Sequence, residues 1–346
     1  MEDGFRDPAS IARKIHVPTY DEILEKIRSR YPRGGKTLYE KQLATLQKTY
    51  DIAISKTDFI RSLTRLLDSL HPFYWRLIEI DFDKDKVHKA ISCVSKARKL
   101  ASKFYDKYRF LLLAAEDKRE LLRVASEGRG RILSAFKKCR RELGYLRDLV
   151  IFIQKLPGIN PSLPTIIVAG APSSGKSTLV RNVSRAQPRV AAYPFTTTTI
   201  HIGHARVGDG VVQVIDTPGL LDRPVEEMND VERRAVAALR ELDGLVLFLF
   251  DVSSNAYMDV ERQFKLLLNI IKLIKNKNIV VGFNKIDKAD PSEYERAKAL
   301  VSKLVESGAV QGTLTLSAIS KDQAKKALRE ITEKFLWPNT QLNRHL

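Results

Sequence analysis

The chain contains the stretch Gly170-Ala-Pro-Ser-Ser-Gly-Lys-Ser-Thr178, which fits the G-x-x-x-x-G-K-[ST] pattern of a phosphate-binding loop. It follows the apolar run 165–169 and precedes Leu179-Val-Arg-Asn-Val183, so a strand leads into the loop and a helix leaves it. Glycines let the backbone approach a phosphate chain, and the N–H groups at a helix N-terminus point toward an anion. We therefore predict a nucleotide-binding loop at residues 170–178.

Two side chains of this loop have specific expected roles. Lys176 is expected to reach the β- and γ-phosphates, and the Ser177 hydroxyl is expected to bind Mg²⁺. The residues of the loop that we expect to contact the nucleotide are Gly170, Ala171, Pro172, Ser173, Ser174, Gly175, Lys176, Ser177 and Thr178. The loop alone does not identify the base.

The base is indicated by Asn284-Lys-Ile-Asp287, which follows the apolar run 279–283. In an open α/β sheet, ligands bind at the carboxyl ends of the strands. Asp287 can accept hydrogen bonds from guanine N1–H and from the 2-amino group, whereas adenine would leave this carboxylate unpaired. Asn284 can contact the edge of the base, and the Lys285 stem can cover the ring. The pattern predicts guanine; the alternative is a solvated turn after a core strand.

A weaker signal for guanine follows the apolar run 312–316. Backbone amides in this segment can donate hydrogen bonds to guanine O6. The residues concerned are Ser317, Ala318 and Ile319.

The γ-phosphate end of the site is indicated by Asp216-Thr-Pro-Gly219, which follows the apolar run 211–215. The Asp216 carboxylate is expected near Mg²⁺, through a water molecule, and the Gly219 amide near the γ-phosphate. An ordinary type I or II turn with proline in its usual place would give the same letters. The complete set of contacts expected here is Asp216, Thr217, Pro218 and Gly219.

A run of hydroxyl side chains, Tyr193-Pro-Phe-Thr-Thr-Thr-Thr-Ile200, lies where a first switch segment is expected. One threonine of this run would bind Mg²⁺ and sense the γ-phosphate. A β-prone surface segment is the alternative.

These signals occur in the order of a GTP-binding domain, which we place at residues 165–337. The expected strands are 165–169, 201–207, 211–215, 244–250, 279–283 and 312–316. Helical patterns such as Met258–Lys275 and Lys321–Phe335 alternate with them. The alternation predicts an α/β fold with a mostly parallel sheet and helices on both faces.

The remaining composition limits the class of protein. The chain of 346 residues has room for two domains and only two cysteines, Cys93 and Cys139, so we expect neither a disulfide framework nor a cysteine-rich metal site. No apolar run approaches the roughly 20 residues of a membrane span, and the first residues do not read as a secretory signal. We expect a cytoplasmic monomer without membrane insertion.

The first 156 residues are expected to form an antiparallel bundle of helices, an all-α domain. Apolar residues recur at helical spacing over Tyr39–Leu70, Lys84–Glu127 and Arg131–Leu156, with His71-Pro72 as a break. A linker at 157–164 joins the bundle to the nucleotide-binding domain, and 338–346 form a short tail.

Positive charge is concentrated in this helical part. Residues 1–160 hold 34 Lys and Arg against 21 Asp and Glu, a net charge of +13 out of the total of +18. Basic surfaces attract polyanions, above all nucleic acid, although a generally basic solvated surface is the alternative. The cations expected to contact RNA phosphates are Lys96, Arg98, Lys99, Lys103, Lys107, Arg129, Arg131, Lys137, Lys138, Arg140 and Arg141. Tyrosines among them, such as Tyr105, Tyr108 and Tyr145, are better explained as core residues than as base-stacking platforms.

Taken together, several motifs resemble those of the nucleolar GTP-binding protein family, a branch of the Obg-related GTPases. They are Ser69-Leu-His-Pro-Phe-Tyr74, Asp83-Lys-Asp85, Tyr193-Pro-Phe-Thr-Thr197 followed by Gly203-His204, and Asp216-Thr-Pro-Gly-Leu-Leu-Asp222. The resemblance covers almost the whole chain and implies a role in assembly of the large ribosomal subunit, with the helical domain bound to rRNA of the precursor particle. Because the chain ends at Leu346, it resembles a compact, archaeal-type member, for which a nucleolar address is not expected.

The resemblance also implies roles at the reacting end of GTP. Thr197 precedes Gly203 by six residues, as the second threonine does in the family's switch pattern, so Thr197 is the expected Mg²⁺ ligand beside Ser177 and Asp216. The residues expected to act on the γ-phosphate are Lys176, Thr197 and Gly219.

Two positions limit the expected hydrolysis of GTP to GDP. Leu220 stands where many signalling GTPases carry a glutamine that orients the attacking water, so intrinsic hydrolysis is expected to be slow and stimulated by the precursor particle. Ser173 stands where many Obg-related GTPases carry an asparagine that helps hold potassium, which argues against stimulation by potassium.

Three other classes of protein remain open from the sequence. A targeting-type GTPase, which docks ribosomes on a membrane receptor, also places helices before its nucleotide domain, but its base motif usually begins with threonine rather than Asn284. An ATP-dependent kinase would use the same loop, against which Asp287 argues. A structural factor that binds GTP without hydrolysing it is the third class.

Overall fold

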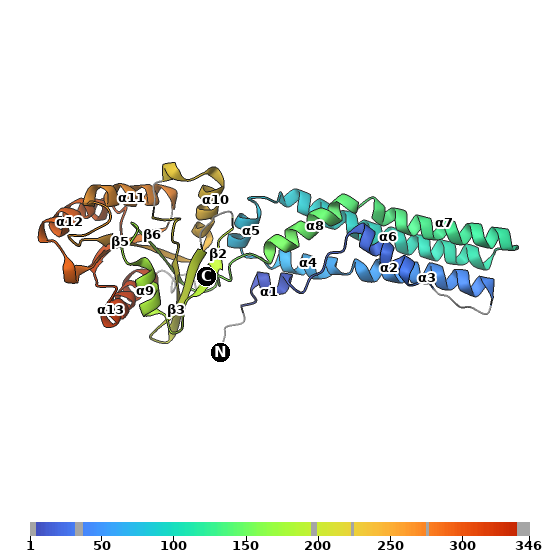
Figure 1. The fold of residues 1–346 in the computed structure, drawn as a ribbon, viewed down its shortest axis with the longest axis horizontal. Helices are drawn as coiled ribbons and strands as arrows, with labels where there is room; N and C mark the ends of the chain where they lie inside the picture. The colour runs from blue at the N-terminus through green and yellow to red at the C-terminus, as the bar shows by residue number, and fades with distance from the viewer. Residues whose placement is uncertain (1–4, 32–36, 195–198, 223–224, 275–276, 338–346) are drawn as a thin grey trace. The chain divides into compact units, whose positions relative to one another are not determined.

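The computed structural model describes residues 5–31, 37–194, 199–222, 225–274 and 277–337 (Figure 1). The chain forms two compact units. One consists of Pro8–Leu70 with Asp81–Lys155, and the other includes His71–Ile80 and the chain from Leu156 onward. We call the first the helical unit and the second the α/β unit.

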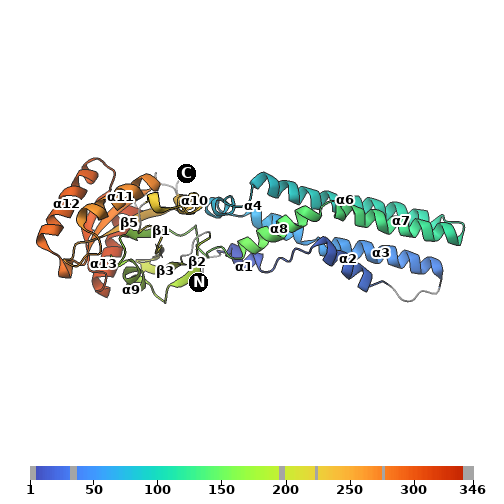
Figure 2. The same ribbon diagram turned by 45° about the horizontal axis from the view of Figure 1, so that its top comes forward.

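The helical unit is built from long amphipathic helices, and α3, α6 and α7 lie side by side in it (Figures 1 and 2). Several begin at side-chain caps: Thr19 and Thr37 each form a reciprocal capping box with the glutamate three residues later. The helices are α1 (Pro8–Ala12), α2 (Tyr20–Ser29), α3 (Leu38–Lys56), α4 (Phe59–Asp68), α6 (Lys84–Leu113), α7 (Lys118–Lys137) and α8 (Arg140–Ile153). The structure thus confirms the all-α character expected for this part of the chain.

The pattern over Tyr39–Leu70 was expected to form one helix, and it forms α3 and α4 instead. The break lies at Thr57 and Asp58. Arg98 of α6 donates to the Ile54 carbonyl at 2.6 Å and to the Asp58 carboxylate at 2.9 Å. The guanidinium therefore adds to the hydrogen bonds that the Thr57 amide and hydroxyl make with the Ile54 carbonyl at the end of α3.

The helical pattern over Lys84–Glu127 was expected to end before Gly128, but α7 runs on through Gly128 and Gly130. A Cβ atom added at Gly128 would lie 2.8 Å from the Cβ atom of Tyr108 on α6. Glycine at this position is therefore required for the close approach of α6 and α7 rather than for a turn.

The tyrosines of this unit belong to its packing. Tyr105 is 8% exposed and stacks on Tyr50 with a centroid distance of 4.6 Å. Tyr108 is 3% exposed and donates to Glu127 at 2.6 Å. The interpretation of these two residues as core side chains is confirmed.

The two cysteines form a disulfide bond, which the cysteine count did not predict. Cys93 lies on α6 and Cys139 immediately precedes α8, and their Cα atoms are 6.0 Å apart although 46 residues separate them in sequence. The expectation failed because a count of cysteines carries no information on which helices pack together.

The α/β unit contains a seven-stranded sheet with the order β2-β3-β4-β1-β5-β6-β7. The two pairs that involve β3 are antiparallel and the other neighbours are parallel. The strands are β1 (Thr165–Gly170), β2 (Arg189–Ala192), β3 (Thr199–Val207), β4 (Gly210–Asp216), β5 (Gly244–Asp251), β6 (Asn278–Asn284) and β7 (Gly312–Thr315). The mostly parallel α/β fold is confirmed; β2, an exposed edge strand, was not predicted.

Helices cover both faces of this sheet (Figures 1 and 2). On one face, α9 and α13 pack on a core of β-branched and leucine side chains, and α10 and α11 lie on the other. The helices that follow the strands are α9 (Lys176–Val183), α10 (Asp230–Ala238), α11 (Val260–Leu273), α12 (Pro291–Glu306) and α13 (Lys321–Ile331). No helix within the described ranges is long and apolar enough to cross a bilayer.

A short helix from the N-terminal part of the sequence, α5 (Pro72–Ile78), belongs to the α/β unit. Phe73 and Tyr74 are buried, and the Tyr74 hydroxyl donates to the carbonyls of Pro157 at 3.0 Å and Ile159 at 2.5 Å. The expected helical domain 1–156 is therefore interrupted by α5. The expected linker 157–164 is packed into the α/β unit, since the Asn160 amide donates to buried Gln213 at 3.0 Å.

Replacing Tyr74 with phenylalanine is expected to lower the free energy of unfolding of the α/β unit by about 1–3 kcal/mol, because it removes the donor from two buried carbonyls. Burial raises the pKa of Tyr74, so its hydroxyl keeps the proton that it donates. Trp75 and Trp337 both lie in this unit, so urea unfolding followed by tryptophan fluorescence measures the change. Tyr257→Phe is the matched control, because Tyr257 is 67% exposed. An equal change in both variants would contradict the assignment.

Candidate nucleotide-binding site

The expected phosphate loop lies at the carboxyl end of β1, between β4 and β5 in the sheet. Its backbone adopts conformations that need glycine: Gly170 has φ 139° and Gly175 has φ 101°. A Cβ atom at Gly170 would lie 2.5 Å from the Leu249 carbonyl oxygen of β5. The loop then enters α9 at Lys176, so the first turn of that helix presents its free N–H groups to the loop.

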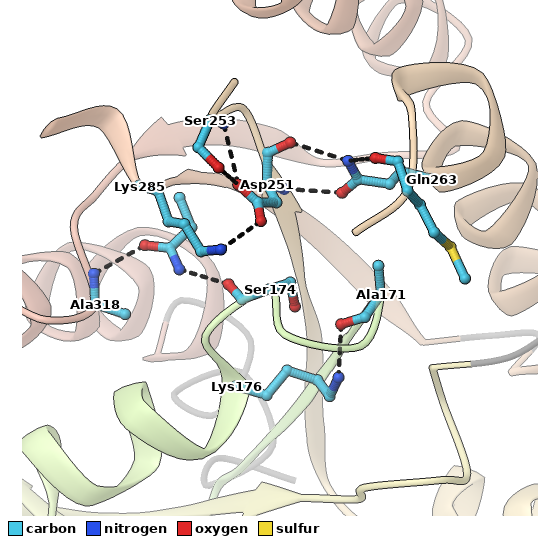
Figure 3. Close-up of polar contacts among 10 residues, drawn as sticks. Ala171, Ser174, Lys176, Asp251, Ser253, Gln263, Lys285 and Ala318 are labelled. Atoms are coloured by element: carbon cyan, nitrogen blue, oxygen red, sulfur yellow. Dashed lines mark hydrogen bonds and ion pairs between the residues drawn. The ribbon is translucent and has the colours of Figure 1, made fainter. Parts of the chain in front are cut away.

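Lys176 is buried, with 6% of its surface exposed. Its ammonium group donates to the Ala171 carbonyl at 2.8 Å (Figure 3). It also donates to the Gly170 carbonyl at 3.0 Å and lies 3.8 Å from the Asp222 carboxylate. Burial lowers the pKa of Lys176, and the carboxylates of Asp222 and Asp216 oppose that shift. A buried ammonium group in this position favours an anionic ligand.

The expected Mg²⁺ ligands Ser177 and Asp216 are in contact. The Ser177 hydroxyl donates to Asp216 Oδ2 at 2.5 Å, and His201 Nδ1 lies 3.2 Å from the same oxygen. Asp216 is fully buried, and its Oδ1 atom has no hydrogen-bond partner among the described residues. A buried carboxylate oxygen beside a hydroxyl suits a hard cation such as Mg²⁺, directly or through water. The third expected ligand, Thr197, lies outside the described residues, as does the whole segment 195–198.

Beside the loop is a cavity of about 320 Å³. Its lining brings together residues from the phosphate loop and from both segments predicted to bind guanine, and Asp287 faces it with an exposed side chain. The lining residues are Ser173, Gly175, Thr178, Ser253, Ser254, Asn255, Asn284, Lys285, Asp287, Lys288, Ser317, Ala318 and Ile319. Segments more than 100 residues apart in sequence therefore converge on one site of a size suited to a base and ribose.

Asn284 has a structural role that its place in the motif did not reveal. It is buried, its amide nitrogen donates to the Ser174 carbonyl at 2.6 Å, and its oxygen accepts from the Ala318 amide at 2.8 Å (Figure 3). The side chain thus forms a bridge between the phosphate loop and the Ser317-Ala318 segment, and its expected contact with the edge of the base stays a prediction, because the amide nitrogen carries a second N–H. The side chain sets the distance between the two ends of the cavity.

Asp251 is a site residue that sequence reasoning missed. It ends β5 directly opposite Asn284 of β6, and its buried carboxylate accepts from the Lys285 ammonium at 2.6 Å and from the Ser253 hydroxyl at 2.7 Å (Figure 3). Gln263 of α11 donates to the Asp251 carbonyl at 2.9 Å. These contacts hold the Lys285 stem along one wall of the cavity. The sequence signal that could have identified Asp251 as a site residue is its position directly after the apolar run 244–250.

The phosphate loop, the buried aspartate next to Ser177 and the adjacent base cavity define the class: a GTP-binding protein with a P-loop fold. One family description, the NOG1 N-terminal helical domain, matches residues 13–160, and a second, nucleolar GTP-binding protein 1 (NOG1), matches residues 230–287. The chain belongs to the nucleolar GTP-binding protein 1 family. This match confirms the resemblance and leaves the targeting-type and kinase classes without support.

Relatives with this name are similar over most of the chain. Nucleolar GTP-binding protein 1 of Drosophila melanogaster is 30% identical over 331 residues, which are 92% of this chain and 51% of the relative. The Caenorhabditis elegans protein is 32% identical over 308 residues, 84% of this chain and 44% of the relative. The chain therefore spans about half the length of these relatives. A crystal structure assigned to the Plasmodium falciparum protein is 31% identical, with a TM-score of 0.46, and covers 55% of this chain and 96% of that one.

Proposed function

We propose that the protein is a slow GTPase that acts as a switch in assembly of the large ribosomal subunit, with its helical unit bound to rRNA. The proposal is carried by the position of Lys176, Asp216 and Asp287, which all lie at the carboxyl ends of strands of one sheet. The chain also belongs to a family named for nucleolar GTP-binding proteins. In this proposal GTP binds with Mg²⁺ held by Ser177, Asp216 and Thr197. The protein acts as a monomer off the particle, in the cytoplasm.

The proposed site separates three tasks. The loop amides and Lys176 hold the phosphates, and the buried Asp216 orients the metal, which would withdraw charge from the β- and γ-phosphates when bound. Asp287 selects guanine through two hydrogen bonds. Leu220 is fully buried, so it offers no group to orient the attacking water, and the precursor particle supplies that group.

The proposed RNA contact rests on a row of lysines on α6. Lys96, Lys99, Lys103 and Lys107 recur every three or four residues, so they lie on one face of the helix, and all four are exposed. Other cations expected in this face are engaged within the unit: Arg98 contacts Asp58, Arg129 donates to Gln42, and Arg140 pairs with Asp21. The lysine row, together with the exposed Lys137, Lys138 and Arg141, is therefore the part of the basic surface that is available to phosphates.

Replacing the four lysines of the row with glutamine is expected to weaken binding to large-subunit rRNA fragments. The slope of log affinity against log salt should fall by about one for each phosphate that the variant no longer neutralises. Binding is measured at several salt concentrations, and crosslinking in cells identifies the RNA. The control replaces four exposed lysines of the α/β unit, Lys272, Lys303, Lys321 and Lys325, and should leave the slope unchanged. Crosslinks absent from large-subunit rRNA, or GTP turnover that precursor particles do not stimulate, would refute the proposal.

A further inference from the structure

Asp222, the last residue of the Asp216–Asp222 motif, contacts Gly219 and Lys176, two of the three residues expected to act on the γ-phosphate. Its Oδ2 atom accepts a hydrogen bond from the Gly219 amide at 2.8 Å and lies 3.8 Å from the Lys176 ammonium. The Asp222 side chain is 14% exposed and Lys176 is 6% exposed, so the contact is largely shielded from water. A single anionic oxygen between a backbone N–H and an ammonium group is also the environment of a phosphoryl oxygen.

We propose that the Asp222 carboxylate occupies the position of the γ-phosphate and must leave it when GTP binds, so that Asp222 sets the affinity for GTP relative to GDP. This inference rests on the proposed function. Two anions cannot share one ammonium group and one N–H at this distance, because their repulsion adds to the loss of the hydrogen bond. GDP has no γ-phosphate, so it can bind with Asp222 in place.

A purely local role for Asp222 explains only part of its contacts. A carboxylate three residues after Gly219 can cap the turn that Leu220 closes by donating to the Thr217 carbonyl. Such a cap does not require the approach to Lys176, which comes from a different element, the start of α9. The Asp222 charge also opposes the effect of burial on the pKa of Lys176, so the lysine has a counter-charge that a phosphate would replace.

The experiment compares Asp222→Asn and Asp222→Ala with the wild-type protein. Dissociation constants for a non-hydrolysable GTP analogue and for GDP are measured with Mg²⁺. Removing the competing carboxylate is expected to tighten binding of the GTP analogue about tenfold, the effect of one charge-assisted hydrogen bond, and to change binding of GDP less than about threefold. Asp209→Asn, an exposed aspartate between β3 and β4, is the matched control and should leave both constants unchanged.

The outcomes separate a failure of this inference from a failure of the proposed function on which it rests. Equal weakening of both nucleotides would show that Asp222 only supports the loop, and unchanged constants would show that it does not compete; either result overturns the inference. If the wild-type protein binds neither guanine nucleotide, the proposed function fails instead. Thermal unfolding without nucleotide verifies that each variant is folded, and the more conservative Asp222→Asn variant carries the test if Asp222→Ala does not fold.

Discussion

The Asp287→Asn protein is expected to bind xanthosine nucleotides in preference to guanosine nucleotides. The aspartate offers two acceptors, which match guanine N1–H and the 2-amino group. Asparagine offers one acceptor and one donor, which match N1–H and the 2-carbonyl group of xanthine. Asparagine loses the acceptor for the 2-amino group of guanine, and one hydrogen bond to a charged partner contributes about 1.5–3 kcal/mol. GTP affinity should therefore fall by roughly 10- to 150-fold while affinity for the xanthosine triphosphate rises.

Competition with a fluorescent nucleotide measures both affinities in one experiment. Asp322→Asn is the matched control, because Asp322 is an exposed aspartate at the start of α13, away from the cavity. Retained preference for guanosine would show that Asp287 does not read the base. Loss of all nucleotides, xanthosine included, would show that the substitution damages the cavity rather than its specificity.

The residues that face the ligand were predictable because the chemistry of the ligand restricts which residue types can bind it. A phosphate chain needs glycines, a lysine and a hydroxyl within a few residues, and guanine needs an acidic side chain at the end of a strand. Asp251 and Asp222 escaped this reasoning, because their partners Lys285 and Lys176 come from other elements. A side chain that positions another side chain is recognised by its distance in the folded protein, which sequence spacing does not give.

The elements of the fold also divide into those that the sequence predicts and those that depend on contacts with other elements. The central strands were predictable because their apolar runs, such as 244–250, are buried on both faces. Strand β2 was missed because Arg189–Ala192 lies at the sheet edge, is largely exposed and contains only the short apolar stretch 190–192. The break between α3 and α4 was missed because the Arg98 contact that stabilises it comes from α6.

The domain boundary shows what a sequence pattern does not predict. Residues 72–78 form a helix, but the spacing of their apolar residues does not indicate which of the two cores that helix joins. Buried Tyr74 decides this through its hydroxyl, which bonds to two carbonyls more than 80 residues away. The chain consequently passes between the helical unit and the α/β unit four times, at residues 7–8, 70–71, 80–81 and 155–156.

Reduction of the Cys93–Cys139 disulfide is expected to lower the free energy of unfolding of the helical unit by about 4 kcal/mol. The bond closes a loop with a sequence separation of 46, and loop-closure entropy for that length gives about this value. Because Cys139 is 2% exposed, its thiol stays packed after reduction, so the loss comes mainly from the larger freedom of the unfolded chain. The helical unit should therefore keep its structure in reductant and unfold at lower denaturant concentration.

The two units allow this effect to be measured within one protein. Circular dichroism reports mainly on the helical unit, whereas fluorescence of Trp75 and Trp337 reports on the α/β unit. Reductant should shift the first transition and leave the second in place, and the double variant Cys93→Ala/Cys139→Ala should not respond to reductant. Equal shifts of both transitions, or two free thiols titrated in the unreduced protein, would contradict the disulfide.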